Sequence, residues 1–282
     1  LQRLADRHDD TSPVRIPCRH GGLDERRIGD VHADGFCRGL RNRAFHPDLD
    51  KLARAFTILD QLGRKIAQDV AKRGAEPFQT RIVRAVDQGR RYGVDLAGKI
   101  ACFGEMGIAN TSAATLVVHK LSGLEIAKLV GRGTGLDDAA LSHKQEVLEC
   151  AAKRTGQLAP LEVLAEVGGF EIGTMAGAMI GAAEAGKLVV VDGFIATSSA
   201  ALARAIEPAC AKAFVYAHRS AEQGHRALLE WLEADPLLDF DMRLGEGTGA
   251  LLAVPMIHSA LSLFSMASFS QAGVSGAETV AS

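Results

Sequence analysis

Aromatic residues and an excess of charge of either sign are both scarce in this chain. Phe, Trp and Tyr make up 5% of the 282 residues, although 47% of the residues are hydrophobic. The core is therefore expected to consist mainly of Ala, Leu, Val and Ile, which bury without a polar group to satisfy. The formal net charge of −2 gives no long-range attraction for nucleic acid or for an anionic membrane surface.

Cysteine and long apolar runs are scarce as well. The five cysteines are odd in number and scattered, which favours a reducing compartment over a disulfide framework. The most apolar stretch, residues 175–183, lies between two glutamates and is far too short to span a bilayer. Because residues 1–10 are mostly polar, no signal peptide is visible. These absences predict a soluble, cytoplasmic protein.

Residues 1–50 differ from the rest of the chain in composition. They are rich in Arg, Asp and His, carry few apolar residues, and follow neither a two-residue nor a helical period. Their Cys and His residues, which match no compact pairing pattern of a zinc site, are Cys18, His20, His32 and Cys37. We therefore expect no metal here and an irregular N-terminal segment.

Residues 51–97 are predicted to be helical. Apolar residues recur at three- and four-residue steps from residue 49 to residue 70, Gly74 and Pro77 interrupt the pattern, and a second helix follows through Val86. We expect these helices to pack against the rest of the chain without chemistry of their own.

From residue 98 to residue 282, predicted strands and helices alternate. Short apolar runs predict strands over residues 100–103, 187–191, 214–217 and 240–244, each followed by a helical pattern. Residues 188–191 are all apolar, as is typical of a strand buried on both faces. The alternation predicts an α/β fold with a parallel sheet flanked by helices.

Polar side chains follow the predicted strands. The four that come at or just beyond a strand end are Glu105, Asp192, Ser220 and Glu246. Because ligands bind at the carboxyl ends of strands in parallel sheets, we expect an active site where these residues meet. His218, also at a strand end, suits a ligand contact and a structural role equally well.

Glycines flank Glu246 on both sides. Gly245 and Gly247 permit positive φ and the close approach of a ligand, and Thr248 is placed to cap a helix expected over residues 250–266. Taken alone, this stretch is more typical of a tight turn with a solvated glutamate. The other polar strand ends favour a catalytic base.

The glycine-rich loop 131–135 is a second candidate site. Arg132, Thr134 and the backbone N–H groups suit a phosphate, but the loop has neither Walker nor dinucleotide-binding spacing. A phosphate site and a plain connector explain the loop equally well. Lys144 lies within a helix predicted to begin at Asp137, where it could reach a phosphate, although a lone lysine is more typical of a surface.

Six segments occur in an order found in one enzyme family. They are residues 104–111 (GEMGIANT), 130–138 (VGRGTGLDD), 166–172 (EVGGFEI), 188–196 (LVVVDGFIA), 218–222 (HRSAE) and 243–250 (RLGEGTGA). With these segments and the tail 266–275, the chain from about residue 98 onward resembles the nicotinate-nucleotide–dimethylbenzimidazole phosphoribosyltransferases, enzymes of cobalamin lower-ligand assembly.

The resemblance implies a fold, an activity and partners. Members of that family transfer 5-phosphoribose from nicotinate mononucleotide to 5,6-dimethylbenzimidazole without a cofactor, as homodimers with a Rossmann-like α/β domain and a smaller helical part from the N- and C-terminal segments. The resemblance also implies that Glu246 is the catalytic base and that Glu105 lies near the benzimidazole. The predicted substrate-binding residues are Glu105, Met106, Gly107, Arg132, Gly133, Thr134, Lys144, Asp192, Ser220, Leu244, Gly245 and Gly247.

Residues 1–50 contain no counterpart of the strand-helix region and Asp-His-Gly motif that the family has near its N-terminus. Loss of those strands would expose a sheet edge and part of the benzimidazole pocket. Two alternatives therefore stay open beside the transferase. One is a truncated, non-catalytic relative that binds the nucleotide or benzimidazole, and the other is an enzyme of the same scaffold with a different acceptor base.

Overall fold

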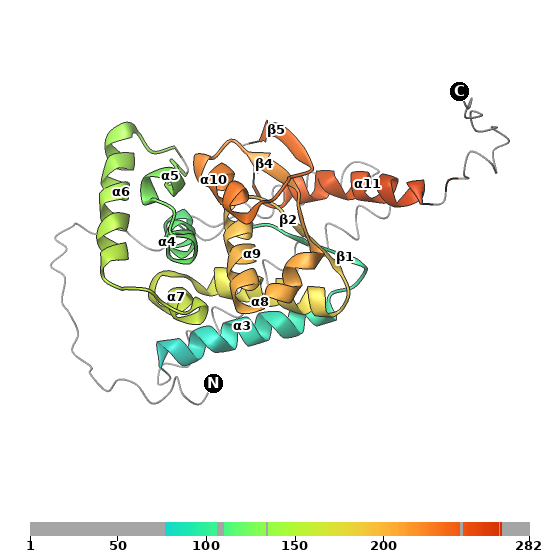
Figure 1. The fold of residues 1–282 in the computed structure, drawn as a ribbon, viewed down its shortest axis with the longest axis horizontal. Helices are drawn as coiled ribbons and strands as arrows, with labels where there is room; N and C mark the ends of the chain where they lie inside the picture. The colour runs from blue at the N-terminus through green and yellow to red at the C-terminus, as the bar shows by residue number, and fades with distance from the viewer. Residues whose placement is uncertain (1–76, 106–109, 134, 243–244, 265, 267–282) are drawn as a thin grey trace, which may run out of the picture. The chain divides into compact units, whose positions relative to one another are not determined.

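Three short apolar runs form a parallel sheet (Figure 1). The computed structural model describes residues 77–105, 110–133, 135–242, 245–264 and 266. Strands β1 (Ile100–Phe103), β2 (Leu188–Val191) and β3 (Phe214–Tyr216) pair in the order β1-β2-β3. Three of the four residues of β2 are buried, in line with its central position. The predicted parallel α/β sheet is confirmed.

The chain passes directly from this sheet into a second one. Strand β4 (His218–Ser220) pairs in parallel with β5 (Leu238–Met242). Between β3 and β4, the N–H of Ala217 donates to Val191 O at 2.8 Å, and its carbonyl accepts from the N–H of Leu238 at 3.0 Å. We expected one strand to end at residue 217 and the next to begin at residue 240. Both expectations are wrong, because pairing with β5 keeps the chain extended beyond Tyr216.

The two faces of the sheet are covered by different helices (Figure 1). Val189 and Val191 of β2 belong to the main hydrophobic core. Val190 points to the other face and packs in a smaller cluster with Ala250 and Ala253, which lie on α11. The helices are α3 (Phe78–Asp95), α4 (Thr111–Ser122), α5 (Ile126–Leu129), α6 (Asp138–Lys153), α7 (Pro160–Val167), α8 (Phe170–Glu184), α9 (Phe194–Ile206), the 3₁₀ helix η2 (Pro208–Ala213), α10 (Gln223–Leu232) and α11 (Thr248–Leu263).

Several helix starts follow from local capping. Asp137 caps α6 by accepting a hydrogen bond from the N–H of Ala140 at 2.8 Å, as the sequence predicts. Pro160 occupies the first turn of α7. Thr248 makes no capping hydrogen bond. Its predicted role is wrong because Gly247, with φ of 80°, is the N-cap of α11.

Helices α3 and α8 touch through their backbones. A Cβ atom on Gly93 of α3 would lie 2.0 Å from the carbonyl oxygen of Ala178, and one on Gly181 of α8 would lie 1.9 Å from that of Arg90. Gly89 and Gly177 have equally close backbone neighbours, at 2.1 and 2.0 Å. Only glycine fits at these positions, so the glycines of both helices allow this contact.

None of the helices within the described ranges is long and apolar enough to cross a membrane. The predicted irregular segment 1–50 and the first predicted helix of the 51–97 region lie outside the described residues.

Candidate functional site

A cavity of about 140 Å³ opens at the carboxyl ends of the strands. Its lining residues are Glu105, Thr111, Asp192, Gly193, Phe194, Ile195, Ala196, His218, Ser220, Glu222, Met242 and Gly245. A larger cavity of about 800 Å³ lies at the opposite ends of β1 and β2, beside Ile100 and Leu188, and contains none of the predicted site residues. The smaller cavity is therefore the candidate site.

The structure brings together part of the predicted site. Glu105, Asp192, Ser220 and Gly245 line the cavity. Glu246 does not line it but follows Gly245 directly, and its side chain is half-buried. The predicted residues Met106, Gly107, Thr134 and Leu244 lie outside the described residues.

The turn that carries Glu246 packs against the end of β1. A Cβ atom on Gly104 would lie 2.4 Å from both the Cα and the N of Gly247, so the two backbones are in contact. The amide of Asn110 donates a hydrogen bond of 2.6 Å to the Glu105 carboxylate. Two carboxylates are thereby held on touching turns, Glu105 on one and Glu246 on the other.

Glu246 occupies a strained backbone position. Its φ is 64°, and that of Gly247 is 80°. We expected positive φ to be possible at Gly245 and Gly247; it occurs at Gly247 and at Glu246 itself. A left-handed conformation costs a non-glycine residue roughly 1–3 kcal/mol, and such residues cluster at active sites.

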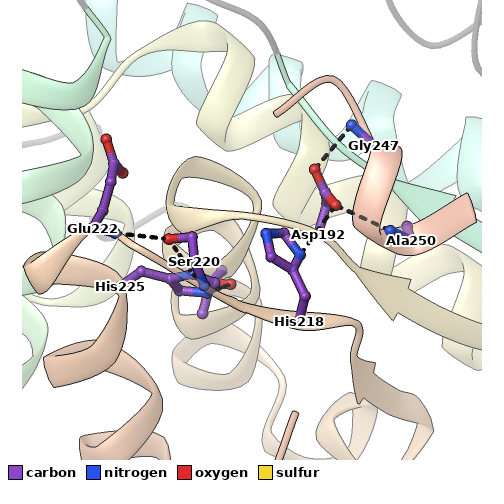
Figure 2. A network of polar contacts seen from close by, with 8 residues as sticks. Asp192, His218, Ser220, Glu222, His225, Gly247 and Ala250 are labelled. Atoms are coloured by element: carbon purple, nitrogen blue, oxygen red, sulfur yellow. Dashed lines mark hydrogen bonds and ion pairs between the residues drawn. The ribbon is translucent and has the colours of Figure 1, made fainter. Parts of the chain in front are cut away.

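Asp192 faces the backbone of that turn (Figure 2). It is 1% exposed, and its carboxylate accepts hydrogen bonds from the N–H groups of Gly247 at 2.9 Å and Ala250 at 3.0 Å. The Nδ1 atom of His218 lies 3.4 Å from Asp192 Oδ1. Burial raises the pKa of Asp192, while nearby His218 and the backbone N–H groups oppose that rise.

Ser220 belongs to a buried hydrogen-bond chain (Figure 2). Its oxygen accepts from the N–H of Glu222 at 3.3 Å and lies 2.9 Å from His225 Nδ1. Because the N–H of Ser220 also points at Nδ1, we assign Nδ1 as an acceptor and Nε2 as the protonated nitrogen. Nε2 then donates to Thr197 Oγ1 at 3.0 Å. These hydrogen bonds fix the Ser220 hydroxyl at the cavity wall.

The buried His225 predicts an acid-sensitive stability. Burial, with His218 and Arg219 nearby, lowers the pKa of His225 from 6.5 to about 3. Above pH 6.5 the imidazole is neutral in both folded and unfolded chains, so the free energy of unfolding does not depend on its protonation. Below it, only the unfolded chain takes up the proton, and the free energy of unfolding falls by about 1.4 kcal/mol per pH unit.

Denaturation of the wild type and of His225→Gln between pH 7.5 and 5 measures this effect. The variant lacks the His225 contribution to the acid-side slope, and the exposed control His143→Gln keeps it. Equal slopes in the wild type and His225→Gln would contradict the assignment.

Lys144 lies beside the cavity, close enough to Glu222 for the two charges to affect each other. The ammonium of Lys144 donates to Thr111 Oγ1 and to Gly131 O, both at 3.0 Å, so this half-buried residue is not an ordinary surface lysine. Burial lowers the pKa of Lys144 and raises that of Glu222, and each opposes the other's shift through its charge. No role was predicted for Glu222, whose place two residues beyond a strand end is evident only once residues 218–220 are known to form β4.

Arg132 does not reach the cavity. Its exposed guanidinium donates to Leu136 O at 2.9 Å and pairs with Asp138, so it closes its own loop. Gly133 lies nearer to the cavity, since a Cβ atom there would lie 3.7 Å from Oγ1 of Thr111, a lining residue. The loop therefore adjoins the cavity wall through Thr111 and Lys144, and not through Arg132.

A parallel α/β fold with carboxylates at its strand ends is an arrangement that many small-molecule enzymes share. Residues 59–274 match the model of the DBI_PRT family, described as phosphoribosyltransferase. With more than half of its residues matched, the chain belongs to this family.

Individual relatives make the comparison more specific. The chain is 51% identical over 203 residues to the nicotinate-nucleotide–dimethylbenzimidazole phosphoribosyltransferase of Dechloromonas aromatica, covering 69% of this chain and 58% of the relative. The enzyme of that name from Cupriavidus necator is 54% identical over 177 residues, or 62% of this chain and 51% of the relative. The chain thus spans between half and three fifths of the length of these relatives.

A solved structure has a similar fold. The crystal structure of CobT from Thermus thermophilus is 40% identical with a TM-score of 0.67, covering 70% of this chain and 60% of that one. This similarity confirms the expected α/β class with helices on both faces of a parallel sheet.

Proposed function

We propose that this chain transfers 5-phosphoribose from nicotinate mononucleotide to 5,6-dimethylbenzimidazole, giving α-ribazole 5′-phosphate and nicotinate. The observation that carries the proposal is the contact between the turns of Glu105 and Glu246, the first of which lines the cavity. The names of the relatives support this substrate pair. Glu246 is the residue we propose as catalytic base.

The chemistry needs only one basic group. In nicotinate mononucleotide the leaving group is a pyridinium, whose departure with the electron pair of its C–N bond neutralises the ring nitrogen, so no general acid is required. One benzimidazole nitrogen forms the new bond to the ribose carbon, and the N–H proton of the ring passes to Glu246. Such proton transfer is worth about 10²–10⁴ in rate, and alignment of the two bound substrates supplies more.

The other polar groups suit the nucleotide. The ammonium of Lys144 has three donor protons and donates two of them to Thr111 and Gly131. One proton therefore remains for the phosphate or the carboxylate of the substrate. We propose that Glu222 accepts hydrogen bonds from ribose hydroxyls and that Ser220 contacts the nicotinate ring substituents. In this scheme Arg132 orders its loop and does not bind substrate.

Replacing Lys144 by Gln should weaken binding of nicotinate mononucleotide at least about tenfold, the usual cost of losing one charged hydrogen bond. Isothermal titration with the nucleotide alone measures the change. Lys153→Gln is the matched control, because it makes the same replacement on an exposed residue of the same helix. Equal affinities of the two variants would remove Lys144 from the site.

Release of nicotinate tests the proposed function directly. Purified protein is incubated with nicotinate mononucleotide, with and without 5,6-dimethylbenzimidazole, and free nicotinate is quantified. Release that depends on the benzimidazole supports the transferase. Binding of the nucleotide without release supports the alternative of a non-catalytic relative, and release with another base supports a different acceptor.

We also propose a homodimer in the cytoplasm. The observation that supports the homodimer is the number of large apolar side chains that α11 and the residue after it expose, among them Leu252, Leu261 and Phe264 at 49%, 56% and 90% exposure. Light scattering during size-exclusion chromatography gives the mass, and a monomer would contradict the proposal.

A further inference from the structure

We propose that Asp192 is a positioning residue, which holds the turn that carries Glu246 and does not bind substrate. This inference rests on the proposed function, since it assumes that Glu246 is the base. It departs from the expectation that Asp192, as a carboxylate at a strand end, contacts the ligand.

The hydrogen bonds of Asp192 bracket the turn. Its Oδ2 atom accepts from Gly247, the residue directly after Glu246, and its Oδ1 atom accepts from Ala250 in the first turn of α11. Both carboxylate oxygens are therefore engaged by backbone groups 55 and 58 residues away in sequence. With the residue 1% exposed, little of the carboxylate is left for a ligand.

The turn requires such a restraint. Two consecutive residues, Glu246 and Gly247, are in the left-handed region, which Glu246 adopts at a cost. A carboxylate that satisfies the N–H groups at a helix start offsets this cost, because those groups have no partner within the helix. The strained conformation thus depends on a side chain from a different part of the fold.

The space around Asp192 is closed by two further residues. His218, itself 1% exposed, lies against Oδ1. A Cβ atom on Gly249 would stand 2.1 Å from His218 Nδ1 and 2.7 Å from Asp192 Oδ1. The start of α11 therefore approaches the pair so closely that only glycine fits, and the position of the turn follows from the position of β2 and β4.

The test compares Asp192→Asn with Asp235→Asn, an exposed aspartate outside the site. An amide keeps one oxygen acceptor but turns an NH₂ group toward the second backbone N–H. We expect kcat for nicotinate release to fall at least about tenfold, the cost of one lost charged hydrogen bond. We expect the Kd for nicotinate mononucleotide to stay within about threefold of the wild type, and hydrogen exchange over residues 245–254 to accelerate. The control should match the wild type in all three.

Weakened nucleotide binding with unchanged kcat and unchanged exchange would overturn the proposal and make Asp192 a substrate ligand. Unchanged values throughout would overturn it as well. In the wild-type protein, the amide protons of Gly247 and Ala250 must be protected from exchange; rapid exchange there contradicts the proposal even if the variant does not fold. If the wild type releases no nicotinate, the proposed function fails, while the exchange measurements still decide whether Asp192 holds the turn.

Discussion

Glu246→Gln will bind nicotinate mononucleotide as the wild type does and will release nicotinate about 10²–10⁴ times more slowly, the usual contribution of a general base. Glutamine has nearly the same size and can adopt the same rotamers, but its amide cannot accept the benzimidazole proton at neutral pH. The loss should therefore fall on kcat, with little change in the Kd for the nucleotide. Steady-state assays of nicotinate release, with binding measured separately by titration, make this distinction.

The chain offers a closely matched control. Glu233 also has positive φ, 55° against 64° for Glu246, and it lies at the end of α10. Glu233→Gln therefore makes the same chemical change on the same kind of backbone and should leave turnover unchanged. Full turnover in Glu246→Gln would exclude Glu246 as the base and leave Glu105 as the candidate for that role.

Gly93→Ala should give the largest loss of stability among the substitutions considered. The added methyl group would lie 2.0 Å from the carbonyl oxygen of Ala178, so α3 and α8 must move apart along a contact that is backbone to backbone. Overpacking of this kind costs about 1–3 kcal/mol. Thermal or chemical denaturation measures the change in the free energy of unfolding, and Gly181→Ala should behave in the same way.

Gly156→Ala is the control for this prediction. It adds the same methyl group at an exposed glycine with nothing within 4 Å and no left-handed backbone. Its effect should stay within about 0.5 kcal/mol or be slightly stabilising, because alanine restricts the unfolded chain. If Gly93→Ala is no more destabilising than Gly156→Ala, the two helices are not in backbone contact.

Local patterns predicted the elements that local energetics determine. The four apolar residues at 188–191 became β2, and Asp137 marked the start of α6. The strand over residues 218–220 was missed, because its extended form comes from pairing with β5 and not from its polar sequence. The backbone contact of α3 with α8 had a readable signal, glycines four residues apart at 89 and 93, whose significance shows only once the helices are paired.

The candidate site, too, was predictable from the sequence only in part. The rule that ligands bind at strand ends predicted that Glu105, Asp192, Ser220 and Glu246 would meet. The first three line one cavity, whereas Glu246 does not line it but follows Gly245, which does. What each group does there depends on contacts that sequence spacing does not encode. Asp192 meets backbone groups more than 50 residues away, and Lys144 reaches Gly131 from another element. Glu222 received no role, because its place beyond a strand end is evident only once residues 218–220 are known to form β4.

Ala217 joins the two small sheets, since its N–H bonds to β2 and its carbonyl to the start of β5. Separation of β2 from β3, or of β4 from β5, would disturb a backbone hydrogen bond of this same residue. Partial opening that frees only one wall of the cavity is therefore expected to be rare, and the strand ends should open together as one cooperative unit in native-state hydrogen exchange. The residues that meet at the cavity would then share a single opening free energy, whichever strand they come from.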